Sequence, residues 1–307
     1  MSPPQLSTIG QRWRALSPNN RAILLLLSST FTGACMLALI KGMAVRYDSF
    51  QIAFFRSLFA FLVFLPIAAA TRFDLMRTTY LWQHIWRTMI GVFGMCASYY
   101  AVARLPLALS TAISFAAPLF IVVLAVTVLG ETVRWRRWLA TAVGFLGVLV
   151  SVRPTEGISF AAIVCLLAAL STACSAVVTK RMPVSERFMT ICLWSTLFSA
   201  IATLPPALAV WRMPDLTDFG YLALIGLFGA ASQVGFVQAY RIGEVSAVGP
   251  VDYTRLVFAT IIGFIWFAEL PDAWTATGAA LIVGSTAYIA HREAQLRKKA
   301  RVAATQA

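Results

Sequence analysis

A charged pair three residues apart, Asp252 and Arg255, interrupts an otherwise apolar stretch directly after Gly249 and Pro250. Residues at this spacing lie on one face of a helix, so the two side chains can form an ion pair. Proline removes an amide donor and glycine loosens a helix, which frees backbone carbonyl groups toward a cavity. Two interpretations stay open: the pair stabilises a kinked helix, or it takes part in gating or solute contact.

Uncharged polar side chains recur in other apolar stretches. Amides, hydroxyls and phenols donate and accept hydrogen bonds without a fixed charge, which suits a zwitterionic or neutral polar solute. Hydrogen bonding between helices is the alternative role for each of them. The candidate solute-binding residues are Tyr99, Tyr100, Ser114, Ser171, Gln233, Gln238, Asp252, Tyr253 and Arg255.

Three further side chains near the ends of apolar stretches are candidates for gating or proton coupling. They are His84, Lys41 and Lys180. Histidine titrates near neutral pH, which would suit proton coupling, although a capping or interfacial role fits as well. The long lysine stems can instead reach the membrane surface as anchors.

Catalytic and cofactor motifs are absent from the sequence. It contains neither GxxxxGK[ST], which would bind nucleotide phosphates, nor the zinc-binding HExxH. His84 and His291 lie too far apart to suggest a metal pair, and the five cysteines show no CxxC spacing. We therefore expect no enzyme activity, no cofactor and no bound metal.

The composition is that of a membrane protein. Hydrophobic residues make up 60% of the chain and charged residues 12%, and the mean hydropathy is +0.79. A membrane-spanning helix needs roughly 20 mostly apolar residues. Ten stretches qualify, at about 21–45, 50–70, 82–104, 106–129, 137–152, 158–180, 187–210, 219–241, 245–268 and 274–290.

The basic residues predict an orientation in the membrane. If the N-terminus is cytoplasmic, the cytoplasmic segments hold seventeen of the 25 lysines and arginines and the opposite connections hold four. Such a bias is typical of cytoplasmic loops. The formal charge of +13 therefore indicates topology and attraction to anionic lipid. We expect no nucleic-acid partner, because the charge is scattered over short connections.

An internal repeat organises the chain. At a constant offset of 139 residues, Cys35 matches Cys174, Lys41 matches Lys180 and Pro66 matches Pro205. Ten spans in two copies give five per copy, so the second copy must be inverted in the membrane. The sequence thus predicts an all-α membrane protein of ten transmembrane helices in two inverted five-helix repeats, with both termini cytoplasmic. The expected divisions are an N-terminal segment (1–20), the two repeats (21–153 and 158–290) and a basic tail (291–307).

Five short segments are informative together. They are Phe54-Phe55-Arg56, the stretch from Pro118 to Glu131 that ends in Leu129-Gly130-Glu131, Val152-Arg153-Pro154, Pro250 to Arg255, and Phe267-Ala268-Glu269. These segments resemble the EamA-type ten-helix carriers of the drug/metabolite transporter superfamily. Within that superfamily the chain is most similar to YddG-type amino-acid and metabolite exporters, followed by bacterial S-adenosylmethionine carriers. The resemblance implies a central cavity lined mainly by spans 1, 3, 4, 6, 8 and 9, with spans 5 and 10 peripheral.

These observations favour a monomeric carrier in the bacterial inner membrane that exports small metabolites, above all amino acids, by alternating access. One alternative is uptake or exchange of a nucleoside-like metabolite such as S-adenosylmethionine. Another is a membrane scaffold that transports nothing. The solute, its direction and any coupled proton do not follow from these motifs.

The predicted topology can be tested with single cysteines at Glu156 and Gln295 in a cysteine-free background. An impermeant thiol reagent added to intact spheroplasts should label position 156 and spare position 295, because the charge bias places position 156 outside. Labelling of position 295 alone would overturn the orientation.

Overall fold

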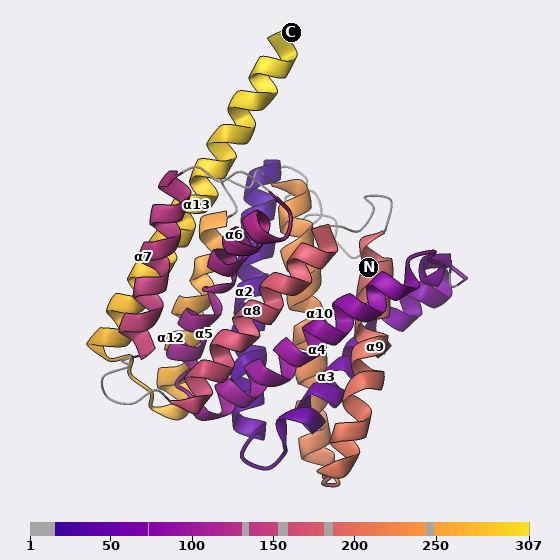
Figure 1. The fold of residues 1–307 in the computed structure, drawn as a ribbon. Coiled ribbons are helices and arrows are strands. Elements are labelled where there is room, and N and C mark those ends of the chain that lie inside the picture. Colours follow the sequence, from indigo (N-terminus) through magenta and orange to yellow (C-terminus); the bar gives the residue numbers. More distant parts are fainter. Residues whose placement is uncertain are drawn as a thin grey trace, which may run out of the picture.

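The computed structural model describes residues 16–72, 74–130, 135–152, 159–180, 187–243 and 249–306, and these form helices joined by short connections (Figure 1). Among them no strand occurs. The helices of the first half are α2 (Pro18–Met43), α3 (Ser49–Ala70), η1 (Asp74–Met76), α4 (Leu81–Arg104), α5 (Leu107–Ser114), α6 (Ala117–Thr127) and α7 (Trp135–Val152). Those of the second half are α8 (Phe160–Lys180), α9 (Phe188–Ala209), α10 (Leu216–Ile242), η3 (Gly249–Tyr253), α12 (Thr254–Phe267) and α13 (Ala273–Gln306).

Six of the helical segments are long and apolar enough to cross a membrane. They are Pro18–Met43, Ser49–Ala70, Leu107–Thr127, Phe160–Thr179, Phe188–Ala209 and Leu216–Ile242. The predicted all-α membrane class is therefore confirmed for the described residues. Ten crossings and the orientation of the termini stay predictions.

The fourth helix of the first half is interrupted, and a 3₁₀ turn precedes the corresponding helix of the second half. In the first half α5 ends at Ser114 and α6 begins at Ala117, with Pro118 in its first turn, where a missing amide hydrogen costs little. In the second half the 3₁₀ turn η3 precedes α12. The break and the turn meet, because the rings of Phe115 and Tyr253 lie 5.3 Å apart between centroids.

The most extensive helix contacts join the two halves. Helix α2 packs on α10, α4 on α8, α3 on α9, and α7 on α13. In chain order α2, α3, α4 and α7 of the first half correspond to α8, α9, α10 and α13 of the second half. Replacing each helix by its counterpart turns the α2–α10 contact into the α8–α4 contact, and it leaves the α3–α9 and α7–α13 contacts unchanged. Helices α2 and α8 also run in opposite directions (Figure 1). This pattern is the one expected of an inverted repeat.

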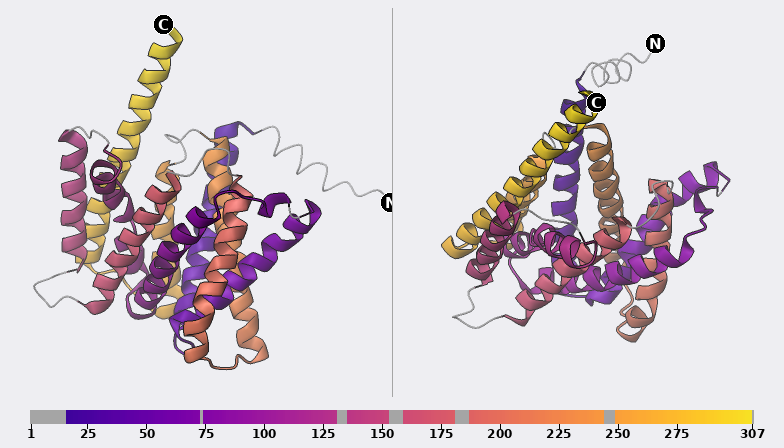
Figure 2. Two further views of the ribbon diagram at one scale, coloured as in Figure 1. Left: turned by 45° about the vertical axis from the view of Figure 1, so that its right-hand side comes forward. Right: turned by 45° about the horizontal axis from the view of Figure 1, so that its top comes forward.

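Helix α2 begins and α13 ends at the same end of the bundle, which we call the terminal end (Figures 1 and 2). Helix α13 continues well beyond the neighbouring helices there. The connections after α2, α4, α9 and α12 lie at the opposite end. The basic tail predicted for residues 291–307 thus continues the last helix through residue 306.

Glycines allow α7 and α13 to approach closely. A Cβ atom added at Gly147 would lie 2.8 Å from the carbonyl oxygen of Gly278. One added at Gly278 would lie 2.5 Å from the carbonyl oxygen of Gly147 and 2.7 Å from the amide nitrogen of Ser151. Backbone atoms cannot move aside as a flexible side chain can. A larger residue at Gly147 or Gly278 must therefore push the two helices apart.

This contact predicts opposite effects for two alanine substitutions in α13. Gly278→Ala should destabilise the purified protein by about 1–3 kcal/mol, because the added methyl collides with the α7 backbone. Gly284→Ala should stabilise it by about 0.5–1 kcal/mol, since nothing lies within 4 Å and alanine favours a helix. Thermal unfolding in detergent measures both, and equal melting temperatures for the two variants would contradict the packing.

Candidate functional site

The start of α12 carries the charged pair identified from spacing. Arg255 Nη2 lies 3.2 Å from Asp252 Oδ1, so the ion pair is present. Both side chains are half-buried, at 32% and 22% exposure. Beside them the hydroxyl groups of Thr254 and Thr30 are 3.0 Å apart and join α12 to α2. This polar contact joins the two halves where η3 leads into α12.

An apolar cavity of about 580 Å³ lies between α5, α12 and α13. Tyr253 is the member of the predicted solute-binding set that lines it, and its remaining walls include Ala108, Leu256 and Val283. Tyr253 also packs on Phe115, so the cavity adjoins the break between α5 and α6 and the turn η3.

A second polar region lies around Arg56 of α3. Its Nη1 atom contacts the sulfur of Met95 in α4 at 3.6 Å, and its buried Nε atom has no hydrogen-bond partner among the described residues. A Cβ atom added at Gly229 of α10 would lie 3.0 Å from Nε and 3.1 Å from the sulfur of Met36 in α2. Helices α2, α3, α4 and α10 therefore surround this guanidinium group.

Arg87 of α4 is a second arginine that lies within the packed part of the bundle. Its Nε atom donates to Thr179 of α8 at 2.8 Å and its Nη1 atom to Ser195 of α9 at 2.6 Å. Among the residues that the structure describes, neither Arg87 nor Arg56 forms an ion pair. Their positive charges are thus balanced by no described carboxylate.

Neutral side chains lie between the two arginines. Cys192 of α9 is within electrostatic range of both guanidinium groups, and Gln233 of α10 donates to its sulfur at 3.5 Å. Tyr99 is buried and within electrostatic range of Arg56. We call Arg56, Arg87, Tyr99, Cys192 and Gln233 the arginine cluster. Two of the predicted solute-binding residues, Tyr99 and Gln233, belong to it.

At the end opposite the terminal end, an ion pair between Lys41 and Glu269 joins the two halves. Lys41 Nζ also donates to the carbonyl oxygen of Leu105 at 2.6 Å, and Glu269 Oε2 accepts from the amide of Leu107 at 2.9 Å. The left-handed conformation of Ala268 (φ 53°) ends α12 and turns the chain toward this contact. We call Lys41, Glu269, Leu105 and Leu107 the end clamp.

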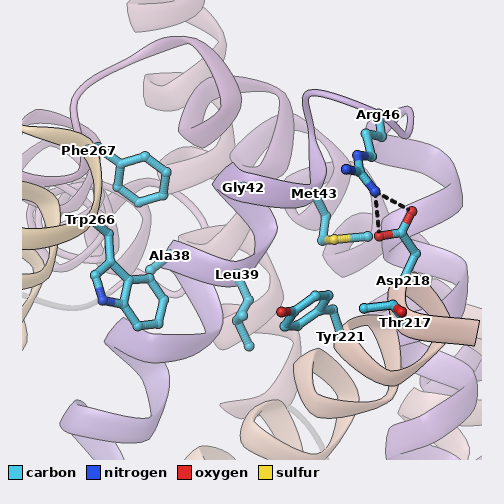
Figure 3. Close-up of a pocket in the computed structure, with 10 residues that line it drawn as sticks. All are labelled: Ala38, Leu39, Gly42, Met43, Arg46, Thr217, Asp218, Tyr221, Trp266 and Phe267. Carbon is cyan, nitrogen blue, oxygen red and sulfur yellow. Dashed lines mark hydrogen bonds and ion pairs between the residues drawn. The ribbon is translucent and has the colours of Figure 1, made fainter.

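A further contact at the same end borders an open groove of about 610 Å³ between α2, α10 and α12 (Figure 3). Arg46 Nη1 lies 3.0 Å from Asp218 Oδ1, and Tyr47 donates to Oδ2 of the same carboxylate at 2.7 Å. Burial, and then the hydrogen bond to Asp218, raise the pKa of Tyr47, so the phenol remains a donor. The groove contains none of the predicted solute-binding residues.

Other predicted residues are used in helix packing. Ser171 donates to the carbonyl oxygen of Ile90 at 2.5 Å and so joins α8 to α4. Ser114 donates within its own turn, to Thr111 at 2.6 Å, and the ring of Tyr100 stacks under Arg104 at 3.6 Å. Their hydroxyl or ring contacts in this conformation are with protein groups, and their part in solute binding stays a prediction.

The remaining candidates are His84, Gln238 and Lys180. His84 is fully buried in α4, and Gln238 is half-buried in α10. Lys180 is the last residue of α8, and its side chain lies outside the described residues. The roles predicted for these three residues therefore stay predictions.

Sequence reasoning assigned no role to Arg56, Arg87, Thr30 or Glu269, which the structure places in polar contacts. A charge within an apolar span was an available signal for both arginines, since intramembrane ionisable residues are often functional. The Ala268-Glu269 corner was visible in the repeat, although its partner Lys41 lies 228 residues away in the sequence.

Comparison with known proteins gives the family. The profile of the EamA-like transporter family matches residues 20–153 and 159–290. The S-adenosylmethionine uptake transporter of Rickettsia prowazekii (strain Madrid E) is 32% identical over 82% of this chain and 86% of its own length. The riboflavin transporter of Rhizobium johnstonii is 29% identical over 96% and 95%. The pseudopaline exporter CntI of Pseudomonas aeruginosa (strain PAO1) is 28% identical over 85% and 93%.

One solved structure, described only as a crystal structure of a protein, has the same fold. It superposes with a TM-score of 0.62 at 18% identity and covers 89% of this chain and 98% of that chain. The helical arrangement is therefore shared with an experimentally determined protein.

The end clamp predicts energetic coupling between Lys41 and Glu269. The substitutions Lys41→Met and Glu269→Gln, alone and together, form a double-mutant cycle for the free energy of unfolding in detergent. We expect a coupling energy of about 1–3 kcal/mol, because each single change leaves a half-buried charge unpaired. The exposed pair Arg187–Asp74, with side chains 65% and 52% exposed, is the control and should couple by less than about 1 kcal/mol. Equal coupling in the two pairs would contradict the clamp.

Proposed function

The chain belongs to the EamA-like transporter family, and from this premise we propose that it carries a nucleoside-like metabolite of the S-adenosylmethionine class by uptake or exchange. The proposal rests above all on the 32% identity with an S-adenosylmethionine uptake transporter across 82% of the chain. The riboflavin transporter adds a second relative whose named solute is a large heteroaromatic metabolite. Transport without catalysis is thereby the proposed activity.

The polar groups of the interior are compatible with such a solute. S-adenosylmethionine combines a carboxylate, an ammonium group, a sulfonium centre and an adenine ring. Arg56 offers a cation, Asp252 offers a carboxylate already shared with Arg255, and Tyr253 with Phe115 offers aromatic faces. Aromatic faces attract both heteroaromatic rings and cations.

Amino-acid export, the function favoured by the sequence, has less support than this alternative. None of the three relatives reported above is named for an amino acid. They also include both an uptake transporter and an exporter, so relatedness alone leaves the direction open. A carrier without a coupled energy source moves its solute down the solute's own gradient, and uptake follows if the external concentration is higher.

We further propose that the carrier works as a monomer by alternating access, with all ten spans crossing the inner membrane and both termini in the cytoplasm. The end clamp then lies at the external end and holds it closed in this conformation. For the external end to open, Lys41 and Glu269 must separate. Each half then adopts the tilt that the other half has in this conformation. Lys180 has the position of Lys41 in the second repeat, and its gating role is part of this proposal.

Counterflow in proteoliposomes tests the proposed solute. Vesicles loaded with unlabelled S-adenosylmethionine should transiently accumulate labelled S-adenosylmethionine from outside, because exchange through one carrier couples the two flows. Vesicles loaded with buffer, and protein-free vesicles, are the controls for binding and leakage. Riboflavin and a mixture of neutral amino acids are then tested as competitors. Counterflow of neutral amino acids without any counterflow of S-adenosylmethionine would restore the export interpretation.

A further inference from the structure

Arg56 is a cation that the bundle holds without a described anionic partner. Its Nε atom is buried and has no hydrogen-bond partner among the described residues, and its Nη1 atom contacts the weakly accepting sulfur of Met95 at 3.6 Å. A buried polar atom without a hydrogen-bond partner costs free energy, and so does a charge withdrawn from water without a counter-ion. The Arg56 side chain is half-buried, so part of this cost remains in the ligand-free protein.

The groups that face Arg56 from the surrounding helices are neutral or positive. They are Met36 of α2, Met95 and Tyr99 of α4, Cys192 of α9 and Gly229 of α10, with Arg87 as the second cation of the cluster. Among the described residues, each ionised carboxylate that forms an ion pair does so with another base. The cluster thus combines two positive charges with uncharged donors.

Part of the arginine cluster is only half-buried. Arg56, Arg87 and Gln233 keep partial exposure, as does the neighbouring Met95, whereas Tyr99 and Cys192 are buried. Gly229 lies tightly against Arg56 and Met36, but the flexible side chains of Met36 and Met95 can repack around a ligand. An anionic group could therefore reach Arg56 from within the bundle.

The two guanidinium groups differ in their hydrogen bonds to the protein. Arg87 donates from Nε to Thr179 and from Nη1 to Ser195. Among the described residues Arg56 makes only a sulfur contact at Nη1, so its two terminal nitrogens remain available for two hydrogen bonds. Two adjacent N–H donors of one guanidinium group match the two oxygens of a carboxylate. A phosphate dianion would call for more than one such group.

We propose that the arginine cluster is an anion subsite in which Arg56 binds the carboxylate of the transported solute, while Arg87 raises the local positive potential. This assignment rests on the proposed function for the identity of the solute. It explains why a costly unpaired cation is present, because binding energy from the carboxylate offsets its burial. It also predicts discrimination between acids and their uncharged derivatives.

A stability measurement that needs no solute tests the first step. Arg56→Gln should leave the melting temperature of the ligand-free protein unchanged or raise it, because an unpaired buried charge is removed. Arg87→Gln is the matched control and should lower the melting temperature, because it breaks hydrogen bonds to α8 and α9. A decrease for Arg56→Gln as large as that for Arg87→Gln would show that Arg56 is structural and would overturn the proposal.

A neighbouring carboxylate supplies a second solute-free test. Met95→Glu places an acid beside Arg56 and should raise the melting temperature above that of Met95→Gln, which has the same shape without the charge. It should also lower the affinity for a carboxylate solute, because the guanidinium group is then occupied. Equal melting temperatures of the two Met95 variants would contradict the proposal that Arg56 binds an anionic group.

Ligand binding tests the second step. Wild-type protein should bind S-adenosylmethionine at least about tenfold more tightly than its carboxamide, since charge-assisted hydrogen bonds to the carboxylate are lost. In Arg56→Gln this preference should disappear, while carboxamide binding is retained. Equal binding of acid and amide by the wild type would overturn the carboxylate assignment. If the wild type binds neither, the proposed function fails, and the two stability tests still decide whether the anion subsite exists.

Discussion

A charge withdrawn from water in an apolar bundle is stabilised by a partner, and this constraint accounts for the ion pairs that hold the protein together. Lys41 pairs with Glu269, Asp252 with Arg255, and Arg46 with Asp218. The first and third of these pairs join segments far apart in the sequence, so they also hold the helices together. Arg56 and Arg87 depart from this pattern among the described residues, and Arg56 also lacks the hydroxyl acceptors that Arg87 has, which is why it directs attention to a ligand.

The repeat gives the polar contacts their arrangement. The helix contacts are related by exchange of the two halves, which gives a two-fold related bundle. The break between α5 and α6 meets the turn η3 at Phe115 and Tyr253. The end clamp crosses from one half to the other at one end of this bundle. A contact of this kind favours one tilt of the halves, and its rupture is the step that an exchange of tilts would require.

Local features of the sequence predicted local structure well. The i, i+3 spacing of Asp252 and Arg255 allowed an ion pair, which the structure contains. Gly249 and Pro250 indicated an irregular helix, and the 3₁₀ turn η3 lies there. The pairing of Lys41 with Glu269 was not predicted, because a helix pattern does not specify which distant segment lies beside it. Ser171 illustrates a related limit: a hydroxyl in an apolar span can face a cavity or a neighbouring helix, and only the position of Ile90 in α4 decides.

The most direct test of the account is an experimental structure of the protein with S-adenosylmethionine bound. We expect the solute carboxylate to lie within about 3 Å of the Arg56 guanidinium group, the usual distance of a charge-assisted hydrogen bond. Tyr99 and Gln233 should border the same end of the ligand. A bound solute whose carboxylate contacts other groups, with Arg56 still unpaired or paired to a protein carboxylate, would contradict the account.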